Sequence, residues 1–149
     1  MAFGNPYGDA WDVDEVVSAV DLLVDAGVTQ ISLADTVGLA SPAMIRDVMS
    51  CVMGVHDGLE VGVHLHARPD EAANKVRAAY EAGCRRFDAA IGGLGGCPFA
   101  QDTLVGNLPT EVLLATLRDL GARLPELEPL EALLMRSGEI ARRFGLQLQ

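Results

Sequence analysis

Short apolar segments alternate with amphipathic segments along most of this chain, and this alternation restricts the fold more than any other feature. The apolar segments are predicted to be strands over residues 29–34, 59–66 and 85–91, and residues 1–8 have the pattern of the end of an earlier strand. Each is followed by a segment with apolar residues at helical spacing, and each repeat takes about thirty residues, as in βαβ units. Strands joined by helices lie parallel in one sheet, so the predicted fold class is α/β.

Helix-capping signals bound the amphipathic segments. Aspartate, serine and proline are frequent at helix starts, and glycine is frequent just beyond helix ends. In chain order, the predicted starts are Asp12 or Asp14, Ser41-Pro42, Pro69 and Pro109, and the predicted ends are Gly27, Gly58 and Gly83. Two further helical segments, residues 127–135 and 137–144, are expected to finish the chain.

Four parallel strands are half the number in a closed (β/α)₈ barrel, which usually takes about 250 residues. This chain has 149 residues, so we expect residues 1–149 to form one domain, a partial TIM barrel with a C-terminal helical extension. Helices on one side of such a sheet would leave an apolar inner face and two open edges, which proteins usually cover. The expected partner is a second copy of the chain, in a homo-oligomer, or a separate chain with the first half of the barrel. The remaining alternative is a fragment.

Composition argues against several classes of protein. The formal net charge of −10 disfavours a nucleic-acid backbone as partner, since phosphate binding requires clusters of lysine and arginine. No apolar run approaches the roughly 20 residues of a membrane helix, and no secretory signal is recognisable. The cysteines are odd in number and lack CxxC spacing, which argues against a disulfide framework or a zinc knuckle and favours a reducing cytoplasm. They are Cys51, Cys84 and Cys97.

Residues 90–111 form a glycine-rich connection between the last predicted strand and the next helix. A connection this long inside a compact domain is usually functional when it is ordered. Its glycines allow the backbone to approach a ligand closely, and Cys97 follows them directly, beside the rigid Pro98. The alternative is a glycine-rich surface turn with an ordinary buried thiol, because a single cysteine is weak evidence of chemistry.

Working groups of parallel α/β proteins lie at the carboxyl ends of the strands. His64 and His66 are the most specific candidate metal ligands among the residues at these ends. Residues two apart on a strand share a face, and two imidazoles on one face can bind one divalent cation. The alternative is two histidines that are satisfied by hydrogen bonds at a strand end. The other polar residues at such positions are Asn5, Ser32, Asp35, Thr36, Asp88, Asn107 and Glu111.

Several of these residues have an equally simple structural interpretation. Asp35 suits a turn or an N-cap. Asp88 lies inside an apolar run, so it requires a basic partner or a place at the border of the site, because burial of an unpaired carboxylate is costly. Asn107 could complete a coordination shell or belong to a plain Gly-Asn turn. Glu111, in the first turn of a helix, interacts favourably with the helix dipole.

The segments MAFGNPYG, ISLADTVG, VHLH and GGLGGCPFAQ…GNLPTE, in this order, resemble 3-hydroxy-3-methylglutaryl-CoA (HMG-CoA) lyase. That family belongs to the metal-dependent, TIM-barrel pyruvate-carboxyltransferase-like superfamily. The resemblance covers nearly the whole chain and corresponds to the second half of the barrel. The GGLGGCP segment is its most specific part, because the related isopropylmalate and homocitrate synthases share His-x-His but not this cysteine loop.

The resemblance implies a role for each candidate residue. The implied ligands of Mg²⁺ or Mn²⁺ are His64, His66 and Asn107. The implied catalytic residues are Cys97, on a mobile loop, and the supporting Glu111, and the implied substrate-binding residues are Ser32, Asp35 and Thr36. The implied reaction is retro-Claisen cleavage of a 3-hydroxyacyl-CoA to acetyl-CoA and a 3-oxo acid. In it the cation polarises substrate oxygens, and Cys97 moves protons while its loop excludes water.

Three departures limit this resemblance. The chain has no counterpart of the family's Asp-Arg-Glu segment, which supplies an aspartate ligand and an essential arginine. Ala67 and Arg68 follow the second histidine where the family has an aspartate, and the loop between Cys97 and Asn107 is one residue longer. Without a carboxylate ligand, the lone chain is expected to bind metal weakly, and a different acyl-CoA or hydroxy acid is open as the substrate.

Two alternatives stand beside the lyase. One is an aldolase or Claisen-type synthase that acts on a 2-oxo acid, against which the intact GGLGGCP segment argues. The other is a non-catalytic half-barrel that serves as an assembly subunit.

Overall fold

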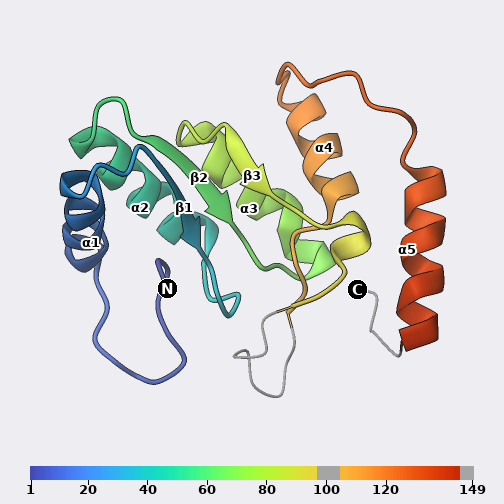
Figure 1. The fold of residues 1–149 in the computed structure, drawn as a ribbon, viewed down its shortest axis with the longest axis horizontal. Coiled ribbons are helices and arrows are strands. Elements are labelled where there is room, and N and C mark those ends of the chain that lie inside the picture. Colours follow the sequence, from blue (N-terminus) through green and yellow to red (C-terminus); the bar gives the residue numbers. More distant parts are fainter. Residues whose placement is uncertain (97–104, 145–149) are drawn as a thin grey trace.

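The computed structural model of the protein describes residues 1–96 and 105–144, and the strands in it form one parallel sheet in the order β1-β2-β3 (Figure 1). The strands are β1 (Gln30–Ala34), β2 (Glu60–His64) and β3 (Arg86–Asp88). The helices are α1 (Val13–Asp25), α2 (Pro42–Val55), α3 (Pro69–Glu81), α4 (Thr110–Asp119) and α5 (Glu131–Phe144), with a short 3₁₀ turn, η1 (Ile91–Gly93), after β3. This alternation around a parallel sheet confirms the α/β prediction.

Several predicted capping residues lie where the helices begin and end, whereas α2 ends at Val55, before the predicted Gly58. Of the two candidates for the first helix, Asp12 and Asp14, the structure selects Asp12. Asp12 is the N-cap of α1, where its Oδ1 accepts a backbone N–H of the first turn at 2.9 Å. Such a cap stabilises a helix by about 1 kcal/mol. Ser41 caps α2 in the same way at 3.2 Å. Gly27 and Gly83 follow α1 and α3 with φ values of 86° and 102°, a conformation that favours glycine.

The N-terminal segment differs from its prediction, because residues 1–8 form no strand within the described chain. The Ala2 N–H donates to the Ala34 carbonyl at the end of β1, at 2.9 Å. Asn5 Oδ1 then accepts the backbone N–H groups of Tyr7 and Asp9 at 2.9 and 3.3 Å. Asn5 therefore stabilises a local turn, and the described sheet has three strands where the sequence predicts about four.

The prediction of two separate C-terminal helices is wrong, because α5 runs without interruption through position 136. Arg136 forms an ion pair with Glu139 at 2.7 Å across the expected break. Ser137 Oγ donates to the Ile91 carbonyl of η1 at 3.2 Å. A contact between residues far apart in sequence thus stabilises the helix where the local pattern suggests an interruption.

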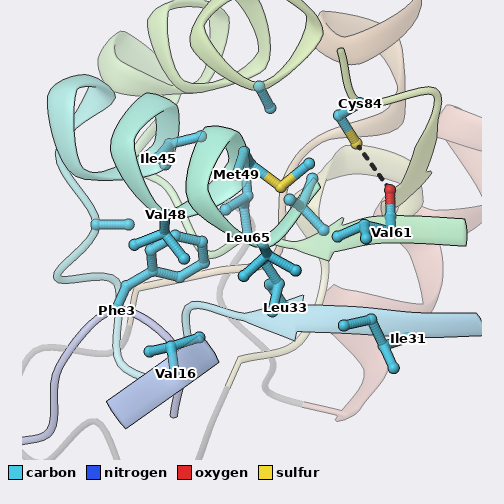
Figure 2. Packing of buried hydrophobic residues seen from close by; sticks show 14 of the residues in the cluster. Phe3, Val16, Ile31, Leu33, Ile45, Val48, Met49, Val61, Leu65 and Cys84 are labelled. Atoms are coloured by element: carbon cyan, nitrogen blue, oxygen red, sulfur yellow. Dashed lines mark hydrogen bonds between the residues drawn. The ribbon is translucent and has the colours of Figure 1, made fainter. Parts of the chain in front are cut away.

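The helices cover one face of the sheet with a closely packed core. Ile31 and Leu33 of β1 point to that face, and Figure 2 shows Leu33 and Leu65 beneath the side chains of α2, including Met49. Cys84 lies at the edge of this cluster with its Sγ directed at the Val61 carbonyl, and burial raises the pKa of its thiol (Figure 2). Within the described residues, no helix has the length and apolar character that a bilayer crossing requires.

The opposite face of the sheet is polar, so the prediction of an apolar inner face is wrong. Gln30 Nε2 donates to Glu60 Oε2 at 2.8 Å, and Arg86 Nε lies 3.1 Å from Glu60 Oε1. Successive strand residues point to opposite faces, and the larger apolar side chains of the strands point to the helices. These are Ile31, Leu33, Val61, Val63 and Phe87. The residues on the polar face are Gln30, Ser32, Ala34, Glu60, Gly62, His64, Arg86 and Asp88.

Candidate active site

Polar residues from the three strands meet at the carboxyl end of the sheet. The strand register pairs Ala34 with His64 and His64 with Asp88, so the last residues of β1, β2 and β3 lie in one row. Asp35 follows β1 directly, and His66 lies two residues beyond the end of β2, at the same end of the sheet. The parallel topology thus brings together residues that are more than 50 positions apart in sequence.

His66 is held in one ring orientation. The residue is 4% exposed, and its Nδ1 lies 2.8 Å from the carbonyl oxygen of Asp35. A carbonyl can only accept, so Nδ1 carries the hydrogen and Nε2 keeps its lone pair. Burial lowers the pKa of His66, and the hydrogen bond to the Asp35 carbonyl only partly opposes this effect. The result is a neutral imidazole with a free Nε2, the form that binds metal ions.

Asn107 lies directly opposite His66. Two backbone hydrogen bonds of 3.1 Å flank the two residues and make them an opposed antiparallel pair. In a pair flanked in this way the two side chains share a face and approach closely. Asn107 Nδ2 donates to the Leu94 carbonyl at 2.9 Å, so Oδ1 is the side-chain atom left for a ligand.

His64 adds a second imidazole beside this pair. The ring centroids of His64 and His66 are 5.1 Å apart, with an interplanar angle of 87°. Two imidazole nitrogens and one amide oxygen form a donor set that suits a divalent transition-metal ion such as Mn²⁺. Among residues 1–96 and 105–144, no three His, Cys, Asp or Glu side chains are grouped to hold a metal ion. The residues therefore fit a cation as a partial ligand set that needs further ligands.

Asp88 connects the ends of β1 and β2. Its Oδ2 accepts a hydrogen bond from Ser32 Oγ at 2.9 Å and lies 3.8 Å from His64 Nδ1. The His64 and Asp88 side chains are 39% and 47% exposed, so this cluster faces solvent on the polar side of the sheet. Asp88 thus lies at the border of the site, beside a histidine that is positively charged only when protonated.

Asp35 is 1% exposed, and its carboxylate is used inside the protein. Oδ2 lies 3.0 Å from Lys75 Nζ, and Oδ1 accepts the Ala40 N–H at 3.0 Å. These contacts are those expected of a residue that stabilises a turn. The group of Asp35 that contacts His66 is its main-chain carbonyl. Thr36 is partly exposed in the same turn.

The glycine-rich connection is hydrogen bonded at its base. The Asn107 N–H donates to the Gly95 carbonyl at 3.3 Å, and a Cβ on Gly95 would lie only 3.0 Å from Asn107 Nδ2. Glu111, in the first turn of α4, accepts the Gly92 N–H through Oε2 at 3.1 Å. Cys97 lies outside the described residues, as do residues 98–104. Glu111 therefore holds the start of the segment that leads to Cys97.

Lys75 is the residue at this site that sequence analysis missed. It is 3% exposed on α3, and its Nζ donates to Asp35, to the Gly38 carbonyl and to the His66 carbonyl. A signal was present in the sequence: Lys75 occupies the apolar stripe of its helix together with Ala72, Val76 and Ala79. A charged residue in such a stripe indicates a buried partner, because an unpaired charge is rarely buried.

Comparison with known proteins identifies the family. The HMGL-like family profile matches residues 1–132. The (R)-citramalyl-CoA lyase of Chloroflexus aurantiacus is 34% identical over 147 residues, which are 99% of this chain and 45% of that protein. The mitochondrial HMG-CoA lyase of Homo sapiens is 34% identical over 120 residues, which are 80% of this chain and 37% of that protein. The chain thus spans less than half the length of these relatives.

Solved structures show the same partial match. An HMG-CoA lyase from Acinetobacter baumannii, in complex with coenzyme A and 3-methylmalate, has a TM-score of 0.80 at 37% identity, covering 97% of this chain and 46% of that one. The HMG-CoA lyase of Bacillus subtilis has a TM-score of 0.82 at 29% identity, covering 99% of this chain and 48% of that one. These structures are TIM barrels. The chain therefore belongs to the HMGL-like family and has the fold of about half of its barrel.

Proposed function

We propose that this chain supplies the second half of the active site of an acyl-CoA lyase, which cleaves a 3-hydroxyacyl-CoA to acetyl-CoA and an oxo acid. The oxo acid is a 3-oxo acid when the substrate is HMG-CoA and a 2-oxo acid when it is (R)-citramalyl-CoA. The opposed pair of His66 and Asn107 supports this proposal most directly. Each side chain has one polar atom fixed by a backbone carbonyl and leaves the other, Nε2 or Oδ1, for a ligand. The relatives named above are lyases of HMG-CoA and (R)-citramalyl-CoA, which supports an acyl-CoA as the substrate class in this proposal.

The reaction breaks the bond between C2 and C3 of the acyl group. A base removes the proton of the C3 hydroxyl, and that oxygen becomes the carbonyl oxygen of the oxo acid. The electron pair of the broken bond passes to C2, which takes up a proton to give acetyl-CoA. In this proposal the proton at C2 comes from Cys97, which follows the described Gly96 in sequence, because a thiol can both hold and donate a proton.

The described residues have three tasks in this scheme. His64, His66 and Asn107 would hold a divalent cation, which when bound polarises the oxygen substituents at C3. Ser32 and Asp88 offer a hydroxyl and a carboxylate on the polar face, beside His64, to orient polar groups of the substrate. Thr36, in the turn after β1, is proposed to bind the substrate beside them. Glu111 anchors Gly92 and so the start of the segment that carries Cys97.

The remaining ligands come, in this proposal, from a chain that carries the first half of the barrel. The polar inner face supports this choice over a homo-oligomer, because charged and amide groups such as Glu60, Arg86 and Gln30 suit a solvated barrel interior better than a hydrophobic interface. The cytoplasmic location that cysteine usage predicts is part of the same proposal.

The test begins with calorimetric titration of Mn²⁺ into the chain alone and into its mixture with a polypeptide that carries the first half of a family barrel. We expect weak binding to the chain alone and tight, stoichiometric binding to the mixture, in a complex whose size light scattering defines. His66→Ala and Asn107→Ala should weaken binding by tenfold or more, on the scale known for lost metal-site interactions. Arg77→Met, at an exposed position of α3, is the control.

Acetyl-CoA release from HMG-CoA and from (R)-citramalyl-CoA is then measured with the same complex. Release from either substrate that His66→Ala abolishes would support the lyase. Consumption of acetyl-CoA with a 2-oxo acid, accompanied by hydrolysis of the thioester and release of free CoA, would favour the synthase alternative. A complex that binds Mn²⁺ and turns over neither class of substrate would favour an assembly subunit.

A further inference from the structure

Lys75 is the only lysine in the chain, and it is almost completely buried. Arginine serves at the other basic positions, so a lysine at this one position needs a reason specific to the site. An ammonium is compact and carries three N–H donors that can point in different directions, whereas a guanidinium is a large planar fork. A position surrounded by three acceptors in different directions therefore fits the ammonium group of lysine better than the guanidinium of arginine.

The structure supplies those three acceptors. Lys75 Nζ lies 2.8 Å from the His66 carbonyl, 3.0 Å from Asp35 Oδ2 and 3.3 Å from the Gly38 carbonyl. The three acceptors belong to the segments that follow β1 and β2. Lys75, from α3, thus ties together the two segments that carry the candidate cation ligands and their neighbours.

Hydrogen bonds join His66, Asp35 and Lys75 in a closed ring. The ring Nδ1–H is held by the Asp35 carbonyl, and the Asp35 side chain is held by Lys75. Lys75 in turn holds the carbonyl of His66 itself. Both ends of His66, the ring and the main chain, are therefore fixed relative to one ammonium group.

We propose that Lys75 is a positioning residue for His66: it fixes the ring orientation and tautomer, so that the Nε2 lone pair keeps one direction. Lys75 acts through Asp35 and through the His66 carbonyl and has no contact with a ligand in this role. The inference rests on the proposed function only where it concerns the cation, because the ring orientation can be measured without metal.

The sign of the charge effect separates this role from a purely electrostatic one. A positive charge near a cation site weakens cation binding, so its removal alone would strengthen binding. Loss of a positioning residue has the opposite effect, because the lone pair loses its fixed direction. Partners that orient metal ligands typically change metal affinity by 10- to 100-fold when mutated.

The test compares Lys75→Met with the wild-type chain and with Arg77→Met, which removes the same charge from an exposed position of the same helix. Long-range ¹H–¹⁵N NMR of the histidine rings, in metal-free buffer with EDTA, reports the tautomer of His66. We expect one Nδ1–H tautomer in the wild-type and Arg77→Met proteins and a mixture in Lys75→Met. The Mn²⁺ dissociation constant of Lys75→Met, measured by calorimetry, should rise at least about tenfold.

A second variant covers the case in which Lys75→Met does not fold, since it leaves the Asp35 carboxylate unpaired. Asp35→Asn combined with Lys75→Met removes both charges, and the new amide can still accept the Ala40 N–H. The same mixture of tautomers is expected there. A single His66 tautomer in either folded variant, or an increase in Mn²⁺ affinity, would overturn the proposal. If the wild-type chain binds no Mn²⁺, the cation role of His66 fails, and the ring measurement still decides whether Lys75 positions it.

Discussion

At the scale of single residues, Gly62 shows how a missing side chain can stabilise the polar face. Arg86 of β3 crosses β2 at this position, and its guanidinium donates to the Ile31 carbonyl of β1. A Cβ on Gly62 would lie 2.8 Å from Arg86 Nε and 3.0 Å from the Arg86 carbonyl oxygen. Only glycine therefore lets this arginine link all three strands.

Gly62→Ala should lower the free energy of unfolding by about 1–3 kcal/mol, the range known for overpacking. Urea unfolding measures the change. Gly54→Ala is the matched control, because nothing lies within 4 Å of a Cβ added at that position of α2. That variant should be neutral or stabilising by up to about 1 kcal/mol, since alanine has the higher helix propensity. Equal effects of the two substitutions would contradict the steric explanation.

Burial of His66 predicts an acid-sensitive fold. Its pKa in the folded chain is lowered from 6.5, chiefly because the buried ring is desolvated. As pH falls below about 6.5, the unfolded chain binds this proton and the folded chain does not, so the free energy of unfolding decreases, by at most about 1.4 kcal/mol per pH unit. Above that pH both states are neutral at this position, and its contribution vanishes.

Urea unfolding in EDTA between about pH 7.5 and about pH 5 measures this slope. His66→Gln should show a shallower dependence of the free energy of unfolding on pH, because the substitution removes the titrating ring. His56→Gln serves as a control for a histidine outside the site, paired with Asp21 at 3.0 Å. If the free energy of unfolding has the same pH dependence in the wild type and in His66→Gln, the lowered pKa of His66 does not cause that dependence.

At the scale of elements, α4 and the turn after β3 are joined by one side chain. Glu111 Oε2 accepts the Gly92 N–H, while the Gly93 N–H donates to the Ala90 carbonyl at 3.0 Å. Glu111→Ala should therefore speed amide hydrogen exchange at Gly92 and leave exchange at Gly93 nearly unchanged. Glu111→Gln should restore part of the protection, because its amide oxygen still accepts. Equal acceleration at both glycines would mean that α4 supports the turn by packing and not by this hydrogen bond.

At the scale of the whole molecule, the open edge of β1 is the place where a further strand can add. A cavity of about 370 Å³ lies beside it, lined mainly by apolar residues of α1 and β1, including Val20 and Ile31. Trp11 also lines it, and no described residue accepts a hydrogen bond from its buried Nε1. The Ala2 N–H already bonds the last carbonyl of β1.

Binding of a partner at the β1 edge should be detectable by fluorescence, because Trp11 lies beside that edge and is the only tryptophan in the chain. A first-half barrel polypeptide without tryptophan should change the Trp11 emission on binding and should saturate at one equivalent. Leu23→Asp, which places a carboxylate at an exposed position of the cavity lining, should weaken that binding, whereas Leu133→Asp on an exposed position of α5 should not. Association that leaves Trp11 emission unchanged would place the interface elsewhere.

The sequence by itself determined the features that depend on neighbouring residues. The Ser41 helix cap and the parallel arrangement of the strands were predicted, because each depends on local geometry or a short pattern. Short patterns also singled out His66 and Asn107, whose role as cation ligands stays a prediction. The polar inner face was also readable from strict alternation along β1 and β2, and only its interpretation was wrong.

The tertiary structure alone decided the rest. The continuity of α5 depends on η1, and the partner of Asp35 lies 40 residues away on α3. A buried charge requires a partner, but its position along the sequence does not reveal which one, since any element packed nearby can supply it. The His66 tautomer follows from the same packing, because the carbonyl that selects it belongs to the segment after a different strand.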